Sequence, residues 1–110
     1  MLSPQVLVLI LFYLYIIYSI SSNKYYVGYT NNVERRLFEH NNIDNTTYTS
    51  KHRPWILKKF IVLNNDRGFA MKIEKAVKRS KSRLIIEMII LEINNLKDLA
   101  QLVRVPMHRD

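Results

Sequence analysis

An almost unbroken apolar and aromatic run lies near the start of the chain, from Val6 to Ile20, and reads VLVLILFYLYIIYSI. Val, Ile, Tyr and Phe are typical of buried strands. Polar residues 21–24 (SSNK) then indicate a turn, and a second strand pattern follows at Tyr25–Tyr29. The pattern therefore predicts a β-hairpin whose first strand lies within the apolar run.

The same run also resembles the core of a signal peptide or a membrane anchor. It has 15 uncharged residues, whereas a membrane-spanning helix needs roughly 20. No Lys or Arg precedes it in residues 1–5, although a signal peptide begins with a basic region. We favour the strand, with residues 1–11 as an N-terminal apolar extension. A secreted or membrane-anchored protein is the alternative.

The pattern after the hairpin predicts a helix, a loop and a third strand. The helix begins near Thr30, with Asn31 as its cap and Glu34 three residues later as in a capping box, and ends at about His40. Residues 41–50 are polar and indicate a loop. After Pro54, the segment Trp55–Leu63 (WILKKFIVL) has the composition of a strand.

The last part of the chain is predicted to be helical. A turn at residues 64–68 precedes a helix from Phe69 to about Arg79, and a further helix runs from Arg83 to about Val103. The resulting order is β-β-α-β-α-α. It predicts an α+β protein with a small three-stranded antiparallel sheet flanked by helices.

A helical wheel separates the inward and outward positions of the two middle helices. In the first, Val33 and Leu37 form the buried stripe. Arg36 and His40 lie at its edge, and Arg35 and Glu39 face solvent. The functional interpretation places Arg36 beside the sheet, and the alternative is that its stem only covers the edge of the core.

The second helix places apolar residues inward and basic residues outward. Glu74 falls at the border between the two faces. It could form an ordinary ion pair with Lys78, four residues later. Alternatively, it could bind Mg²⁺, which retains most of its waters and takes only one or two protein carboxylates. The inward residues are Phe69, Ile73, Ala76 and Val77, and the outward ones are Lys72, Lys75, Lys78 and Arg79.

Charge is concentrated in one third of the chain. The net charge is +8. Residues 51–83 hold 11 Lys or Arg and two acids, whereas the rest holds six basic and seven acidic residues. A localised basic surface suits a phosphate backbone or an anionic membrane. The chain has no cysteine, which excludes disulfides, cysteine zinc sites and a thiol nucleophile and is compatible with a reducing compartment.

The chain resembles the GIY-YIG nuclease superfamily, in particular its small stand-alone bacterial members. Tyr13-Leu14-Tyr15 stands where the family has Gly-Ile-Tyr, and Tyr26-Val27-Gly28 stands for Tyr-Ile-Gly. The family's arginine, histidine and glutamate fall on Arg36, His40 and Glu74, and residues 48–55 also resemble those members. The resemblance covers residues 12–88 and leaves 89–110 as a C-terminal helical tail. This chain departs from the family at Tyr13, which replaces a glycine, and at residues 82–87, which lack the family's asparagine.

The resemblance implies a DNA endonuclease that uses one Mg²⁺ or Mn²⁺ ion. Tyr15 is favoured as the base and Tyr26 as the group that orients water. Arg36 would bind the scissile phosphate, His40 would shuttle a proton or position Tyr15, Glu74 would hold the metal, and Gly28 would permit close approach of the backbone. The expected backbone-binding residues are Lys51, His52, Arg53, Lys72, Lys75 and Arg79.

These features lead to three hypotheses. The first is a cytoplasmic, metal-dependent endonuclease with weak sequence specificity that acts on DNA and needs no small-molecule cofactor. The second is a nucleic-acid-binding module of the same fold without catalytic activity, which the missing asparagine would favour. The third is the secreted or anchored protein that the apolar run permits.

Overall fold

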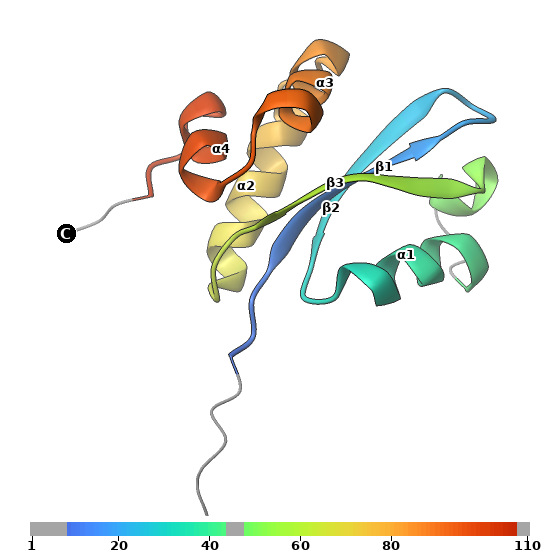
Figure 1. Cartoon of the computed structure of the whole chain (residues 1–110), viewed down its shortest axis with the longest axis horizontal. Coiled ribbons are helices and arrows are strands. Elements are labelled where there is room, and N and C mark those ends of the chain that lie inside the picture. Colours follow the sequence, from blue (N-terminus) through green and yellow to red (C-terminus); the bar gives the residue numbers. More distant parts are fainter. Residues whose placement is uncertain (1–8, 44–47, 108–110) are drawn as a thin grey trace, which may run out of the picture.

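The computed structural model describes residues 9–43 and 48–107, which form a three-stranded antiparallel sheet with helices on both faces (Figure 1). This arrangement confirms the predicted α+β class and element order. The predicted extension at residues 1–11 and the predicted loop at 41–50 lie partly outside the described residues. The strands are β1 (Tyr13–Ser19), β2 (Lys24–Thr30) and β3 (Trp55–Val62), and the helices are α1 (Val33–Asn42), the short 3-10 helix η1 (Tyr48–His52), α2 (Arg67–Arg79), α3 (Arg83–Glu92) and α4 (Leu96–Leu102).

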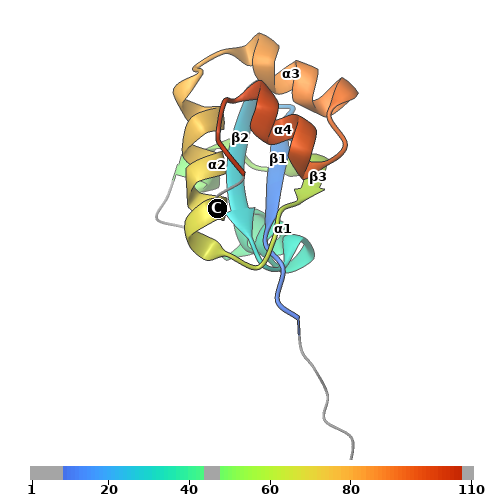
Figure 2. The ribbon, with the colours of Figure 1, turned by 90° about the vertical axis from the view of Figure 1, so that its left-hand side faces the viewer.

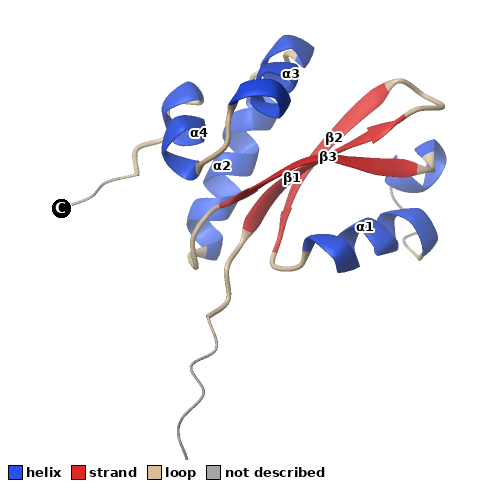
Figure 3. Ribbon diagram, in the orientation of Figure 1, coloured by secondary structure: helices blue, strands red, loops and turns tan. Residues whose placement is uncertain are grey.

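The central position of β1 explains the apolar run. The strand order is β2-β1-β3, and β1 pairs antiparallel with both neighbours (Figure 3). Leu14 and Ile16 pack in the core beneath α2, α3 and α4, whereas Tyr15 and Ile17 face the other side, where Val33 and Leu37 of α1 pack. Figure 2 shows the three C-terminal helices on one face and α1 on the other. A strand covered on both faces requires apolar residues at successive positions.

Three predicted helix boundaries were wrong, each because a neighbouring polar residue provides the cap. Asn32, rather than Asn31, caps α1 by accepting a hydrogen bond from the Arg35 amide. Asp66 caps α2, which therefore begins two residues before Phe69. The predicted helix from Arg83 to Val103 is divided into two, because Asn95 adopts an extended conformation and caps α4. Asn and Asp side chains favour such caps over helix interiors.

The C-terminal helices contribute to the core. Ile89 of α3 and Leu99 and Ala100 of α4 are buried in the cluster that contains Leu14 and Ile16. Among residues 9–43 and 48–107, no helix has both the length and the apolar character to cross a bilayer.

Candidate active site

Four elements bring the predicted site residues together around one pocket. Tyr15 of β1, Tyr26 of β2, Arg36 of α1 and Glu74 of α2 line a common pocket of about 340 Å³. Tyr15 lies opposite Gly28 and Ile17 opposite Tyr26 in the β1–β2 register, so the two tyrosines form a diagonal pair on one face. Their ring centroids are 6.4 Å apart.

Gly28 makes room for Tyr15. A Cβ atom at Gly28 would lie 2.6 Å from Cζ of Tyr15, and the hydroxyl would be closer still. No side chain can occupy that place unless Tyr15 moves. The tyrosine ring therefore lies across the β2 backbone, with its hydroxyl held inside the site.

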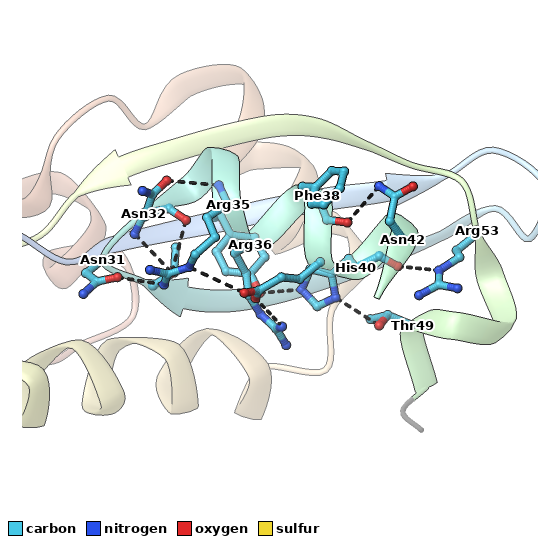
Figure 4. Close-up of polar contacts among 12 residues, drawn as sticks. Asn31, Asn32, Arg35, Arg36, Phe38, His40, Asn42, Thr49 and Arg53 are labelled. Carbon is cyan, nitrogen blue, oxygen red and sulfur yellow. Dashed lines mark hydrogen bonds and ion pairs between the residues drawn. The ribbon is translucent and has the colours of Figure 1, made fainter. Parts of the chain in front are cut away.

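The Tyr15 hydroxyl is part of a buried chain of polar groups. It lies 2.7 Å from Nε2 of His40, and Nδ1 of His40 lies 3.0 Å from Oγ1 of Thr49. Figure 4 shows the His40 ring between α1 and Thr49 of η1. The tautomer with its proton on Nδ1 donates to Thr49 and leaves Nε2 to accept from Tyr15.

His40 is therefore more deeply placed than the helical wheel predicted. It is fully buried rather than at the edge of the helix. The reason is tertiary: η1 closes over the end of α1, and Nε of Arg53 donates to the His40 carbonyl at 2.6 Å. A wheel describes the helix alone and has no information about a segment that returns to cover it.

Burial controls the ionisation of Tyr15. Removal from water raises the pKa of its hydroxyl far above the ordinary value, and the neighbouring Tyr26 raises it further, whereas the guanidinium of Arg36 lowers it. Tyr15 is therefore a neutral hydroxyl at neutral pH. It can lose its proton only to a nearby acceptor, and His40 is placed to be that acceptor.

This pKa shift makes the stability of the protein sensitive to alkaline pH. Unfolded tyrosine ionises near pH 10, whereas folded Tyr15 remains neutral. The contribution of Tyr15 to stability is therefore complete below about pH 10 and is lost as the pH rises toward its folded pKa. Between about pH 9 and about pH 11, we expect the unfolding free energy of Tyr15→Phe to fall less steeply than that of the wild type. Urea titrations across this range test the expectation, and equal slopes would contradict it.

Arg36 lies at the edge of the buried face of α1, as the helical wheel predicted, and lines the pocket. Its side chain is 28% exposed, whereas that of Arg35 is 52% exposed. Its Nη1 donates to Glu39 at 3.0 Å. Glu39 was predicted to face solvent, but it is partly buried because it pairs with both arginines. Partial burial lowers the pKa of Arg36, but the hydrogen bonds to Glu39 and Tyr15 outweigh this effect and raise it. Arg36 is therefore permanently cationic.

Glu74 is the acidic partner across the pocket. Its side chain is 18% exposed, and Oε2 lies 3.4 Å from Nζ of Lys78. The ion pair that the spacing of the two residues indicated is therefore present. Lys78 also lies 5.0 Å above the ring of Tyr26, so it links the carboxylate to the tyrosine pair.

The pocket suits a magnesium or manganese ion held mainly by water. Among the described residues, no group of three or more His, Asp or Glu side chains could form a closed metal site. Glu74 supplies a carboxylate to the lining of the pocket. Mg²⁺ binds through one or two carboxylates and keeps several waters, each of which needs about 30 Å³. The pocket has the space and the ligand type for such an ion.

The predicted backbone-binding residues do not gather at this pocket. Lys72 and Arg79 lie on the other side of α2 and line hollows beside C-terminal residues. His52 forms a hydrogen bond of 2.8 Å with Ser22 through Nδ1 and packs against Tyr48. Arg53 donates a hydrogen bond to the His40 carbonyl. Lys51 and Lys75 are exposed and line neither of the two pockets that Tyr26 borders.

Sequence reasoning missed two arginines that line the pocket, Arg35 and Arg67. Arg67 lies over the Phe12 ring at 5.0 Å. It precedes Glu74 by seven residues, two helical turns, and therefore lies on the same face of α2. The same periodicity places Arg67 on the face of Glu74 once Asp66 is taken as the cap of α2 and Arg67 as its first residue. Tyr13, which replaces the family's glycine, packs against Phe60 at 6.0 Å and does not line the pocket.

Comparisons with known proteins identify a matching family and several relatives. A family model described as the GIY-YIG catalytic domain matches residues 11–85. An uncharacterized protein, L300, of Acanthamoeba polyphaga mimivirus is 35% identical over 88 residues, which cover 76% of this chain and 53% of the relative. UPF0213 proteins of Bacillus cereus and Bacillus thuringiensis are each 37% identical over 54 residues, 49% of this chain and 55% of the relative. The chain thus spans about half the length of the curated relatives it matches.

Proposed function

The chain belongs to the GIY-YIG family of catalytic domains, and on this premise we propose that it is a metal-dependent endonuclease that hydrolyses DNA phosphodiester bonds. The observation that carries the proposal is the convergence of Tyr15, Tyr26, Arg36 and Glu74 on one pocket from four separate elements. A cation, a carboxylate and two hydroxyls around a water-accessible space are the groups that hydrolysis of a phosphodiester requires.

Arg36 binds the scissile phosphate in this proposal. Its planar guanidinium can donate two parallel hydrogen bonds to the non-bridging oxygens. These bonds strengthen as negative charge develops on the oxygens, so they stabilise the transition state more than the ground state. Arg35 and Arg67, which also line the pocket, would attract the neighbouring phosphates.

Tyr15 and His40 act together as the general base. The phenol proton of Tyr15 moves to Nε2 of His40 as Tyr15 takes a proton from the attacking water. Oγ1 of Thr49 accepts a hydrogen bond from Nδ1–H of His40 and so stabilises the imidazolium that forms. Arg36 stabilises negative charge on the Tyr15 oxygen, which burial alone disfavours. Tyr26 borders the same pocket and orients the attacking water.

Glu74 holds the divalent cation. When bound, Mg²⁺ or Mn²⁺ supplies Lewis-acid stabilisation of the leaving oxygen. Glu74 would then exchange its ion pair with Lys78 for the metal, and Lys78 would remain over the Tyr26 ring. Exposed lysines and arginines on the surface bind backbone phosphates. Such contacts position the DNA without reading its sequence. We therefore propose weak sequence specificity.

A second candidate function is nucleic-acid binding without cleavage. The pairing of Glu74 with Lys78 favours it, because a metal ion would have to compete with the lysine for the carboxylate. This candidate predicts salt-sensitive DNA binding whose log K falls linearly with log salt, and no cleavage with either Mg²⁺ or Mn²⁺.

The test is incubation of the purified chain with supercoiled plasmid. We expect nicked circles with Mg²⁺ or Mn²⁺ and none when EDTA replaces the metal. Gel electrophoresis over a time course gives the rate. DNA binding with no nicking in either metal would contradict the endonuclease and favour the second candidate.

A further inference from the structure

A second hollow lies next to the catalytic pocket and shares Tyr26 with it. Its volume is about 450 Å³, and it is bordered by the first half of β2, the end of α2 and the start of α3. Figure 2 shows α2 beside β2, with α3 following at its end. We call it the flanking hollow, and its charged and aromatic lining consists of Lys24, Tyr25, Tyr26, Tyr48, Lys78, Lys81 and Arg83.

Tyr48 presents part of its aromatic ring to this hollow. The residue is 46% exposed. Its ring is stacked with that of Tyr26, with centroids 6.4 Å apart and an interplanar angle of 23°. His52 packs against another side of the Tyr48 ring, with centroids 4.5 Å apart, so a ligand in the hollow would contact the part of the ring that remains exposed. Aromatic rings of this kind stack with nucleobases irrespective of sequence.

The remaining chemistry of the flanking hollow is cationic. Lys24, Lys78, Lys81 and Arg83 line it, and its described lining contains no Asp or Glu. Lys78 and Arg83 are paired with Glu74 and Glu87, so Lys24 and Lys81 supply the charge that attracts an anion. A nucleotide offers a phosphate for these lysines and a base for Tyr48.

Lys81 has a backbone conformation that argues for a role of its side chain. Its φ is 50°, in the left-handed region that glycine adopts readily and other residues adopt at a cost. It joins the end of α2 to Ser82, the cap of α3. A glycine would be favoured at such a helix end, yet the chain has a lysine there that lines the hollow.

We propose that the flanking hollow binds an unpaired nucleotide next to the scissile phosphate, with its base against the exposed part of the Tyr48 ring and its phosphate on Lys81. The base must be unpaired and unstacked, because inside a duplex both faces of a base are covered by its neighbours. The proposal rests on the proposed nuclease function. It specifies the substrate class as DNA with a single-stranded segment at the cleavage position.

The test measures binding of fluorescein-labelled oligothymidylate to the full chain in EDTA, where no cleavage occurs. We expect Lys81→Gly to raise the Kd about three- to tenfold and to reduce the slope of log K against log salt by about 0.7, the value for one phosphate contact on a single strand. Its Tm should equal or exceed that of the wild type, because glycine relieves the left-handed conformation. Lys81→Arg should bind as the wild type does.

Tyr48 provides an independent arm of the same test. Tyr48→Ala should weaken binding of oligothymidylate about tenfold and binding of a blunt duplex of equal length much less, whereas Tyr48→Phe should retain the affinity. Lys81→Asn is a second neutral variant that tolerates the left-handed conformation. Lys97→Ala removes an exposed cation of α4 as a control.

Unchanged affinity and salt slope in both Lys81→Gly and Lys81→Asn would overturn the proposal. So would equal losses for single strand and duplex in Tyr48→Ala. Because the binding measurements are made without metal, their results can be interpreted whether or not the chain nicks plasmid DNA. If the wild type nicks plasmid DNA and the Lys81 variants bind oligothymidylate normally, the proposed role of the flanking hollow is rejected and the nuclease function is not.

Discussion

Arg36→Ala is expected to lower the rate of metal-dependent DNA nicking about 10²- to 10³-fold, the effect of removing a principal donor to a developing oxyanion. Arg36 lines the pocket opposite Glu74, and its guanidinium also stabilises charge on the Tyr15 oxygen. The substitution therefore removes two electrostatic contributions at once. The measurement is the initial rate of nicking of supercoiled plasmid under single-turnover conditions.

Arg36→Lys distinguishes the geometry of the guanidinium from its charge. Lysine keeps the positive charge but cannot donate two parallel hydrogen bonds to a phosphate. We expect it to recover little of the lost rate. Lys97→Ala is the control for loss of a surface cation and should leave the rate unchanged. Full activity in Arg36→Lys would show that charge alone suffices and would contradict the assigned bidentate role.

Gly28→Ala is expected to impair both folding and catalysis. The added methyl would lie 2.6 Å from Cζ and 2.8 Å from Cε2 of Tyr15, so the ring has to move. Overpacking of this kind costs about 1–3 kcal/mol. Any movement also breaks the 2.7 Å contact between the Tyr15 hydroxyl and His40. Urea unfolding measures the first effect and plasmid nicking measures the second.

The other glycine of the chain is a matched control for this substitution. Gly68 lies in the first turn of α2, where an added Cβ would meet only Oδ1 of Asp66, at 3.3 Å. Gly68→Ala is expected to change the unfolding free energy by less than about 1 kcal/mol. Equal behaviour of the two variants would show that the Tyr15 ring does not require Gly28.

Much of the fold followed from local chemistry that the sequence displays. The apolar run at β1, the turn residues before Lys24 and the strand composition after Pro54 predicted the sheet. The helical wheel also distinguished Arg36 from Arg35 and placed Glu74 at a face border, and the structure confirms both positions. Each of these features depends on the residues of one helix or strand and on the spacing of its apolar positions.

The parts that were missed depend on contacts between elements. The burial of His40 requires η1 to fold back over α1, and its partner Thr49 lies in a stretch that was predicted as loop. Lys72 and Arg79 were grouped by charge, although the α2 cations that line the two pockets beside Tyr26 are Arg67 and Lys78. A basic composition indicates an anionic partner, but only the packing of α2 shows which cations could reach it.

The most direct test of this account is the rate of Mg²⁺-dependent nicking by Glu74→Gln. The substitution keeps the shape of the side chain and removes the charge that would bind the metal. Loss of the i,i+4 ion pair with Lys78 should alter stability by only a few tenths of a kcal/mol. Glu92→Gln, an equivalent change at the exposed end of α3, is the control. The account predicts a fall of at least about 10²-fold for Glu74→Gln and no change for Glu92→Gln; equal rates in the wild type and both variants would contradict it.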